Sequence, residues 1–295
     1  MEGKTNTEDR VKASTKVRLA RVCLSLVIAL GVLAPFVFQP VSAGPYSVPG
    51  TPTFPVIYRH RIIKGVALLD WSHKEDIAAL GATKYYGWGP YCNGAADCYN
   101  MNRNWTLPQS TCYSTMLLGN EPTNDEPAGH PISASEAASV TVAIRAACPN
   151  TTLVVANIHV NNSLREQEAL DWLTAYFAAY EAMSGHYFGW YGPKDVLGLH
   201  CYSPSATTCQ TRLDAAMDLM PSQSTKVWIT EFGNYIPANL SSVLTWFDHD
   251  LRIAYVFPYT NRGTGPYLLD MVNSDGTLTD IGQVYAEWTG LSVWQ

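Results

Sequence analysis

The chain has 295 residues, with 19 basic and 25 acidic side chains and a formal net charge of −6. Residues 1–43 hold six of the basic and three of the acidic residues, so the remainder has 13 against 22 and a charge of −9. A domain this acidic is a poor candidate for binding nucleic acid or anionic membranes. The remaining chain of about 250 residues suits one large core, and it has the usual size of an α/β barrel.

Residues 1–43 resemble a targeting segment. Several basic residues precede an apolar run from Val22 to Phe38, and Val41-Ser-Ala43 fits a small-residue cleavage site before Gly44. The sequence therefore predicts export with a cleaved signal peptide. A retained single-span anchor is the alternative, because a run of about 17 residues lies at the short limit for crossing a bilayer. Residues 44–60 are rich in proline and are expected to form a linker.

Residues 61–295 alternate short apolar runs with helical patterns, which is typical of repeated β-α units. The expected strands are Ile62–Leu69, Ala82–Tyr86, Tyr99–Arg103, Thr115–Gly119, Thr152–Asn157, Val196–Cys201, Lys226–Thr230 and Ile253–Pro258. The expected helices are His73–Leu80, Ser133–Ala147, Gln167–Met183, Thr208–Met220, Leu240–His249 and Ile281–Trp288. Eight strands in this order predict a single-domain (β/α)8 TIM barrel of the α/β class, whose catalytic groups lie on the loops after the strands.

Six cysteines lie beyond the targeting segment, an even number in a chain that is expected to be exported. Oxidising compartments favour disulfides, and the short separations suggest Cys92–Cys98 and Cys201–Cys209 as loop staples, which leaves Cys112 and Cys148. Six cysteines allow fifteen pairings, so sequence alone does not fix the connectivity. A zinc site is disfavoured because the sequence has no CxxC or HxxxH spacing.

Two strands end in a glutamate. Met116-Leu-Leu-Gly-Asn-Glu-Pro122 places Glu121 after the fourth strand, and Lys226-Val-Trp-Ile-Thr-Glu-Phe-Gly233 places Glu231 at the end of the seventh. In a closed barrel both carboxylates would reach the same rim, where a retaining glycosidase needs two carboxyl groups about 5 to 5.5 Å apart. Asn120, beside Glu121, could bind a sugar 2-hydroxyl.

Three motifs in this order carry a family resemblance: Leu118-Gly-Asn-Glu-Pro122, Leu199-His-Cys-Tyr202 and Trp228-Ile-Thr-Glu-Phe-Gly233. From about Ile63 to Trp288 the chain resembles the clan A glycoside hydrolases, and within the clan family 128, a β-1,3-glucanase-like group. The resemblance implies that Glu121 is the acid/base and Glu231 the nucleophile. It also implies that Asn120 contacts the 2-hydroxyl and that His200 and Tyr202 line the cleft.

Further candidates lie at the same expected rim. Trp88 and Tyr86 belong to an aromatic loop suited to stacking on sugar faces. Asp70 ends the first strand and Asn157 ends the fifth, so both are expected to point to this rim. Tyr259 lies at the end of the eighth strand, where many relatives place a tryptophan.

The sequence thus predicts a secreted or cell-surface retaining hydrolase that acts as a monomer on a β-linked polysaccharide, with β-1,3-glucan as the favoured substrate. No cofactor is expected, because the chain has no phosphate-binding glycine loop, no GxSxG elbow and no metal-ligand helix. Membrane contact is expected only if the N-terminal segment is retained. Glu121 is expected to have a raised pKa beside an ionised Glu231. The alternative is a catalytically silent carbohydrate-binding or cell-surface barrel.

Overall fold

A computed structural model describes residues 58–69, 71–88, 92, 97–107, 111–125, 129–160, 163–233, 235–263 and 269–294. The expected signal segment, residues 44–57 of the expected linker and Asp70 lie outside the described residues.

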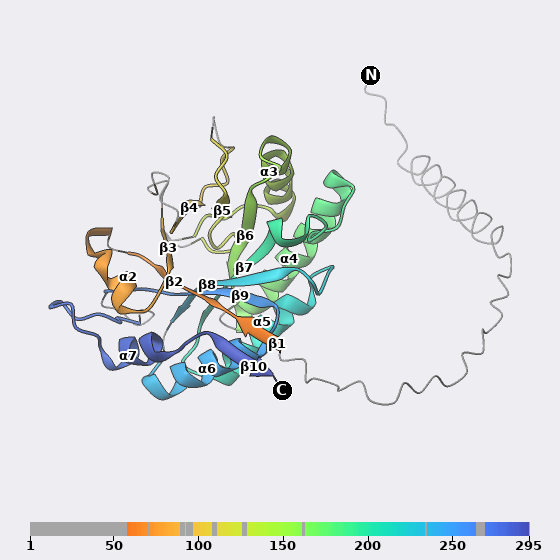
Figure 1. The fold of residues 1–295 in the computed structure, drawn as a ribbon. Helices are drawn as coiled ribbons and strands as arrows, with labels where there is room; N and C mark the ends of the chain where they lie inside the picture. The colour runs from red at the N-terminus through yellow and green to blue at the C-terminus, as the bar shows by residue number, and fades with distance from the viewer. Residues whose placement is uncertain are drawn as a thin grey trace, which may run out of the picture. The chain divides into compact units, whose positions relative to one another are not determined.

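Eight parallel strands close into a barrel in chain order, from β2 to β9, with helices around the outside (Figure 1). Every expected strand is present, so the predicted (β/α)8 barrel is confirmed. The strands are β2 (Ile63–Ala67), β3 (Lys84–Gly87), β4 (Cys98–Asn102), β5 (Thr115–Leu118), β6 (Thr152–His159), β7 (Asp195–Tyr202), β8 (Lys226–Gly233) and β9 (Ile253–Pro258).

The helices also follow the expected order. They are α2 (Glu75–Ala79), α3 (Ala134–Ala147), α4 (Ser163–Ser184), α5 (Ala206–Asp218), α6 (Pro237–His249) and α7 (Asp280–Glu287), with short 3-10 turns at Trp71–His73 and Gly192–Lys194. A side-chain oxygen caps the start of three of them. Ser133, Ser205 and Thr279 each accept a hydrogen bond from a backbone N–H in the first turn. Such caps satisfy amides that have no partner within the helix.

The core has two layers, which follow from the alternation of side chains along each strand. Every barrel strand contributes to an inner cluster, which consists of Ala67, Tyr86, Tyr99, Met101, Leu117, Val154, Val196, Trp228 and Phe257. Their neighbours in sequence, such as Leu153 and Val155, belong to a second cluster shared with the helices. The interior of the barrel is therefore filled with side chains and is not a pore.

Two further strands lie outside the barrel. β1 (Tyr58–Arg61) pairs antiparallel with β10 (Leu291–Trp294), and the two lie side by side near the end of the chain in Figure 1. The described chain thus begins at Tyr58, and its first strand lies partly inside the segment 44–60, which is expected to be a linker. No local pattern predicts this pairing, because the two partners lie at opposite ends of the domain.

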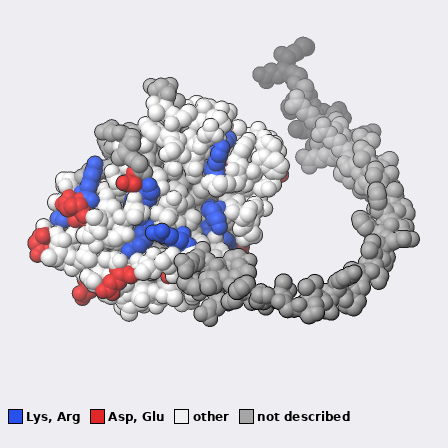
Figure 2. Space-filling model, in the orientation of Figure 1, with Lys and Arg blue, Asp and Glu red and all other residues white. Residues whose placement is uncertain are grey.

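The structure contains all three suggested disulfides: Cys92–Cys98, Cys112–Cys148 and Cys201–Cys209. On the face shown in Figure 2, acidic side chains gather toward the left and lower left, some of them directly beside basic ones, and further basic side chains lie across the middle of a mostly uncharged surface. Among the described residues, no helix has the length and apolarity required to span a membrane.

Candidate active site

Glu121 lies in a tight turn directly after β5. Gly119 and Glu121 both have left-handed backbone angles, with φ of 83° and 46°. Only glycine fits at position 119, since a Cβ atom there would lie 2.0 Å from the ring of Trp105. The turn directs the Glu121 carboxylate over the end of the barrel, where the side chain is 8% exposed.

Glu231 reaches the same place from β8. In the sheet, His159 of β6 is paired in register with His200 of β7, and His200 is paired with Glu231. Adjacent strands lie about 4.8 Å apart, so paired residues present their side chains next to each other. Three neighbouring strands therefore place two imidazoles and a carboxylate in one row beside Glu121.

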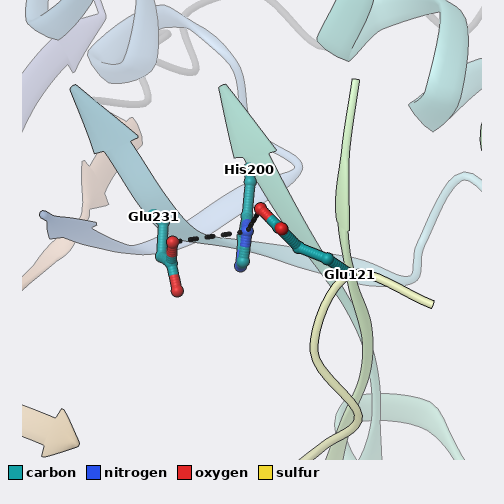
Figure 3. A group of neighbouring side chains, drawn as sticks. All are labelled: Glu121, His200 and Glu231. Carbon is teal, nitrogen blue, oxygen red and sulfur yellow. Dashed lines mark hydrogen bonds and ion pairs between the residues drawn. The ribbon is translucent and has the colours of Figure 1, made fainter. Parts of the chain in front are cut away.

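His200 lies between the two carboxylates, as Figure 3 shows. Its Nδ1 atom is 3.3 Å from Oε1 of Glu121 and 3.5 Å from Oε2 of Glu231. One carboxylate oxygen of each glutamate and this nitrogen all lie within 4.8 Å of one another. His200 is completely buried, so it does not line an open cleft as the resemblance implied. It instead contacts both carboxylates from below the surface.

The pKa of Glu121 is low. Burial raises it, but the hydrogen bond and charge of His200, the charge of His159 and the Asn124 amide together lower it to about 2. The Asn124 amide donates to Oε2 of Glu121 at 2.6 Å, and Nδ1 of His159 lies 3.7 Å from Oε1. Glu121 is therefore ionised in the free protein.

The pKa of Glu231 is high. Burial and the charge of Glu121 raise the pKa, and His200 and two tyrosine hydroxyls lower it, with a net value of about 7. The two carboxylates raise the pKa of His200, which outweighs the effect of its burial. The expectation of a raised Glu121 pKa beside an ionised Glu231 is wrong for the free protein. The sequence could not show that both His200 and His159 would lie beside Glu121.

Two predicted sugar-binding tyrosines hold Glu231 in place. The Tyr202 hydroxyl donates to Oε2 of Glu231, and the Tyr86 hydroxyl donates to the Thr230 carbonyl at 2.6 Å and lies 3.3 Å from Oε1 of Glu231. Tyr86 is fully buried inside the barrel and Tyr202 is 6% exposed. Tyr86 therefore supports the carboxylate from within the barrel, which corrects its expected role in stacking on sugar.

The two predicted asparagines are both buried. Asn120 lies next to Glu121 and is 2% exposed, so its contact with a sugar hydroxyl stays a prediction. Asn157 is 0% exposed, and its amide faces the backbone carbonyls of Leu118 and Gly119. This corrects the expectation that Asn157 contacts substrate, since its polar group is turned into the wall of the barrel.

Trp88 and Tyr259 remain at the rim and are partly exposed. Their rings meet edge to face at 5.1 Å, and Tyr259 meets Tyr202 in the same way at 6.0 Å. Tyr202 in turn contacts the ring of His159 at 5.3 Å. These four rings form an aromatic arc beside the carboxylates, and such rings suit the apolar faces of sugars.

His159 and Asn124 belong to the site, although neither was predicted. The fifth strand was expected to end at Asn157, but β6 continues to His159. The available signal for His159 was its position two residues after Asn157, because a strand that continued past Asn157 would carry a histidine at the same rim. Within the described residues, Glu121, His200 and Glu231 form a group that could also ligate a metal ion. The contacts of His200 with both carboxylates account for this arrangement without a metal.

A sequence model described as "Glycosyl hydrolase catalytic core" matches residues 69–285, well over half of the chain. The chain belongs to this family. The resemblance that the three motifs carried is thereby confirmed. No curated protein matches this glycosyl hydrolase.

Solved structures share the fold of this glycosyl hydrolase at low sequence identity. An endo-β-1,3-glucanase of family 128 from Pseudomonas viridiflava is 20% identical, with a TM-score of 0.57, over 77% of this chain and 97% of that one. One from Amycolatopsis mediterranei, solved in complex with laminaripentaose, is 17% identical, with a TM-score of 0.59, over 77% and 99%. An oligosaccharide-binding protein of family 128 from Cryptococcus neoformans is 19% identical, with a TM-score of 0.55, over 76% and 92%.

Proposed function

We propose that the protein is an exported retaining glycoside hydrolase that cleaves β-1,3-glucan. The observation that carries the proposal is the approach of Glu121 and Glu231, whose carboxylate oxygens lie within 4.8 Å at the same end of the barrel. A separation this short leaves no room for a water between the carboxylates and a sugar, which favours direct attack by one of them over an inverting reaction. The glucan is proposed from the named activity of the structural neighbours.

The two glutamates take different roles. Glu231 attacks the anomeric carbon, and Tyr202 and Tyr86 hold its carboxylate by their hydroxyls. Glu121 gives a proton to the leaving glycosidic oxygen, and then removes a proton from the water that hydrolyses the glycosyl-enzyme. The single carboxyl proton of the pair must therefore be on Glu121 when the glycosidic bond breaks.

His200 provides a route for that proton. In the free protein Glu121 has a lowered pKa and is ionised, Glu231 has a raised pKa and holds the carboxyl proton, and the two carboxylates raise the pKa of His200. The proton on Nδ1 of His200 passes to Glu121 over 3.3 Å, and the same nitrogen accepts the proton of Glu231 over 3.5 Å. The exchange leaves Glu231 ionised and Glu121 protonated without any change in total charge.

The decisive experiment compares laminarin hydrolysis by the wild type, Glu121→Gln and Glu231→Gln. Each substitution keeps the shape of the side chain and should lower kcat on the order of a thousandfold, because each carboxylate contributes several kcal/mol in the transition state. Glu181→Gln is the matched control, since Glu181 is exposed on α4. Near-normal turnover in either active-site variant contradicts the proposal. NMR of the first product should show the β anomer, and an α anomer contradicts retention.

A second candidate function is glycan binding without cleavage. The family 128 structure from Cryptococcus neoformans is described as an oligosaccharide-binding protein, and it shares the fold of this chain. Calorimetric titration with laminarioligosaccharides, followed by chromatography of the mixture, separates the two functions. Binding without any shorter product over a long incubation favours this second function.

Export is part of the proposal. The apolar segment before Gly44 and the three disulfides support it, since disulfides persist in oxidising compartments. N-terminal sequencing of the protein recovered from the medium of its source cells should begin at Gly44. Recovery only from membranes, with residues 1–43 attached, supports the anchor instead.

A further inference from the structure

The strand β6 contains a bulge immediately next to the active site. Its register with β7 shifts between Val155 and Ile158, and Ala156 and Asn157 have φ of 74° and 45°. Left-handed angles at two successive residues other than glycine are costly, and they persist where the surrounding structure holds them. β-Bulges often redirect a side chain next to an active site.

The bulge changes which side chains face the barrel axis. Val154 belongs to the inner cluster, and simple alternation would also turn residues 156 and 158 inward and residue 159 outward. Ala156 and Ile158 instead pack in the outer layer with the helices. The extra residue thus turns His159 to the inside, where its Nδ1 atom lies 3.7 Å from Glu121.

Asn157, at the tip of the bulge, contacts the turn that carries Glu121 on both sides. Its amide donates to the carbonyls of Gly119 at 3.0 Å and Leu118 at 3.2 Å. Its own backbone carbonyl accepts the N–H of Glu121 at 3.0 Å. One residue of β6 therefore fixes the backbone before and at Glu121, although its side chain does not contact the carboxylate.

The neighbouring strand leaves space for this side chain. A Cβ atom at Gly198 of β7 would lie 2.2 Å from Oδ1 of Asn157. The backbone of Gly198 has an ordinary strand conformation, so it does not itself require glycine. Glycine is required there because any side chain would clash with Asn157.

We propose that Asn157 is a positioning residue for Glu121, which holds the Leu118–Glu121 turn so that the Glu121 carboxylate is aligned with the glycosidic oxygen. The inference rests on the proposed function, because it assigns Asn157 to the placement of the proton donor. It predicts that loss of Asn157 impairs the proton transfer to the leaving group much more than the attack by Glu231.

The test uses two substrates that differ in their need for a proton. With laminarin the leaving group is the hydroxyl of another sugar unit, which needs the proton of Glu121. With 2,4-dinitrophenyl β-laminaribioside the leaving group is a stable phenolate, which does not need that proton. For Asn157→Ala we expect kcat/KM on laminarin to fall about 10- to 100-fold, as a catalytic group displaced by about 1 Å does. On the aryl substrate kcat/KM, which reports the first chemical step, should fall less than about threefold.

A second measurement requires no aryl substrate. If the Glu121 turn moves away from His200 and His159, the pKa of Glu121 rises toward its ordinary value. The acid limb of the laminarin kcat/KM profile should then shift to higher pH in Asn157→Ala. Asn157→Ser, which can still donate one hydrogen bond, should lie between the wild type and Asn157→Ala.

Gly198→Ala tests the same contact from the other side. It should reproduce the loss on laminarin, since its new methyl group occupies the space of the Asn157 amide. The double variant Asn157→Ala, Gly198→Ala should be no worse than Asn157→Ala alone, because the clash is gone. Additive losses overturn the inference.

Arg145→Met is the control for general destabilisation. Arg145 pairs with Asp195 at the opposite end of β7, and both side chains are buried. It should lower the melting temperature but keep the wild-type ratio of the two substrates and the wild-type pH profile. If Asn157→Ala behaves in the same way, its role is structural only and the inference is wrong. A wild-type protein that cleaves neither substrate refutes the proposed function itself.

Discussion

Tyr202 donates its hydroxyl hydrogen to Oε2 of Glu231, and the two side chains come from adjacent strands of the barrel. A hydrogen bond to the ionised carboxylate favours that form and lowers the pKa of Glu231, against the effect of burial. Together with the charge of His200, it keeps the pKa of this buried carboxyl at about 7. The proton of the carboxyl pair is therefore lost near neutral pH.

The first prediction concerns Tyr202→Phe. The proposed mechanism requires one proton in the carboxyl pair, so kcat/KM of the wild type should fall as the pH rises above about 7. Removing the Tyr202 hydroxyl raises the pKa of Glu231, so this alkaline limb should move to higher pH. The value at the optimum should fall about tenfold, as expected for the loss of one hydrogen bond to a charged group. Tyr255→Phe, inside the barrel away from both glutamates, should keep the wild-type limb.

The second prediction concerns stability. The folded-state pKa of Glu231 is raised from 4.5 to about 7, so the protein binds a proton there more tightly than the unfolded chain does. The contribution of this group is present below pH 4.5 and is lost as the pH rises through 7. Glu231→Gln removes the dependence and should increase the free energy of unfolding at pH 8 by about 3 kcal/mol relative to the wild type.

Urea unfolding at pH 4.5 and pH 8 measures this difference. The gain of Glu231→Gln should be present at pH 8 and nearly absent at pH 4.5, because the wild-type carboxyl is then neutral as well. Glu121 has the opposite sign: its pKa is lowered to about 2, so its contribution is present above pH 4.5 and is lost as the pH falls to 2. Glu121→Gln should therefore destabilise the protein at pH 8. A gain in both variants contradicts the assignment of the charges.

Much of the fold was readable because most strands are short, largely apolar runs bounded by polar, glycine or proline residues. Glu121 and Glu231 could be assigned to one rim because parallel barrel strands all end on the same side. The pairing of β1 with β10 was not readable, since nothing local at Tyr58–Arg61 indicates a partner at Leu291–Trp294. Local pattern thus sufficed for the barrel but not for contacts between distant segments.

The chemistry of the site was less predictable than its location. Asn157 was assigned to substrate because it ends an apolar run, but the bulge at Ala156 turns its amide toward the Glu121 turn. The same bulge brings His159 into the site. Which glutamate has the higher pKa depends on the distances from Glu121 to His200, His159 and Asn124. These distances cannot be derived from the spacing of residues in the sequence.

The third prediction ranks two disulfides. Cys112–Cys148 joins residues 36 positions apart, whereas Cys92–Cys98 joins residues 6 apart. The entropy of the unfolded chain that a crosslink removes grows with loop length, to about 4 kcal/mol for the longer loop and about 2 kcal/mol for the shorter. Cys112→Ser, Cys148→Ser should therefore lower the melting temperature more than Cys92→Ser, Cys98→Ser. Calorimetry of the two double variants measures the order, and the reverse order contradicts the loop-length argument.

The fourth prediction concerns the aromatic arc at the rim. Trp88 is partly exposed, and its ring meets that of Tyr259 edge to face. A sugar that packs on this arc therefore contacts the Trp88 ring, and this contact does not involve the carboxylates. Trp88→Ala should weaken binding of laminarioligosaccharides about tenfold and raise KM, with a smaller effect on kcat, because the contact exists before and during the reaction. Calorimetric titration in the Glu231→Gln background measures the affinity without turnover. Trp190→Ala is the matched control, since Trp190 is 54% exposed and stacks on His186 in the loop before β7. Equal affinity in Trp88→Ala and Trp190→Ala excludes Trp88 from sugar binding and leaves the arc as packing alone.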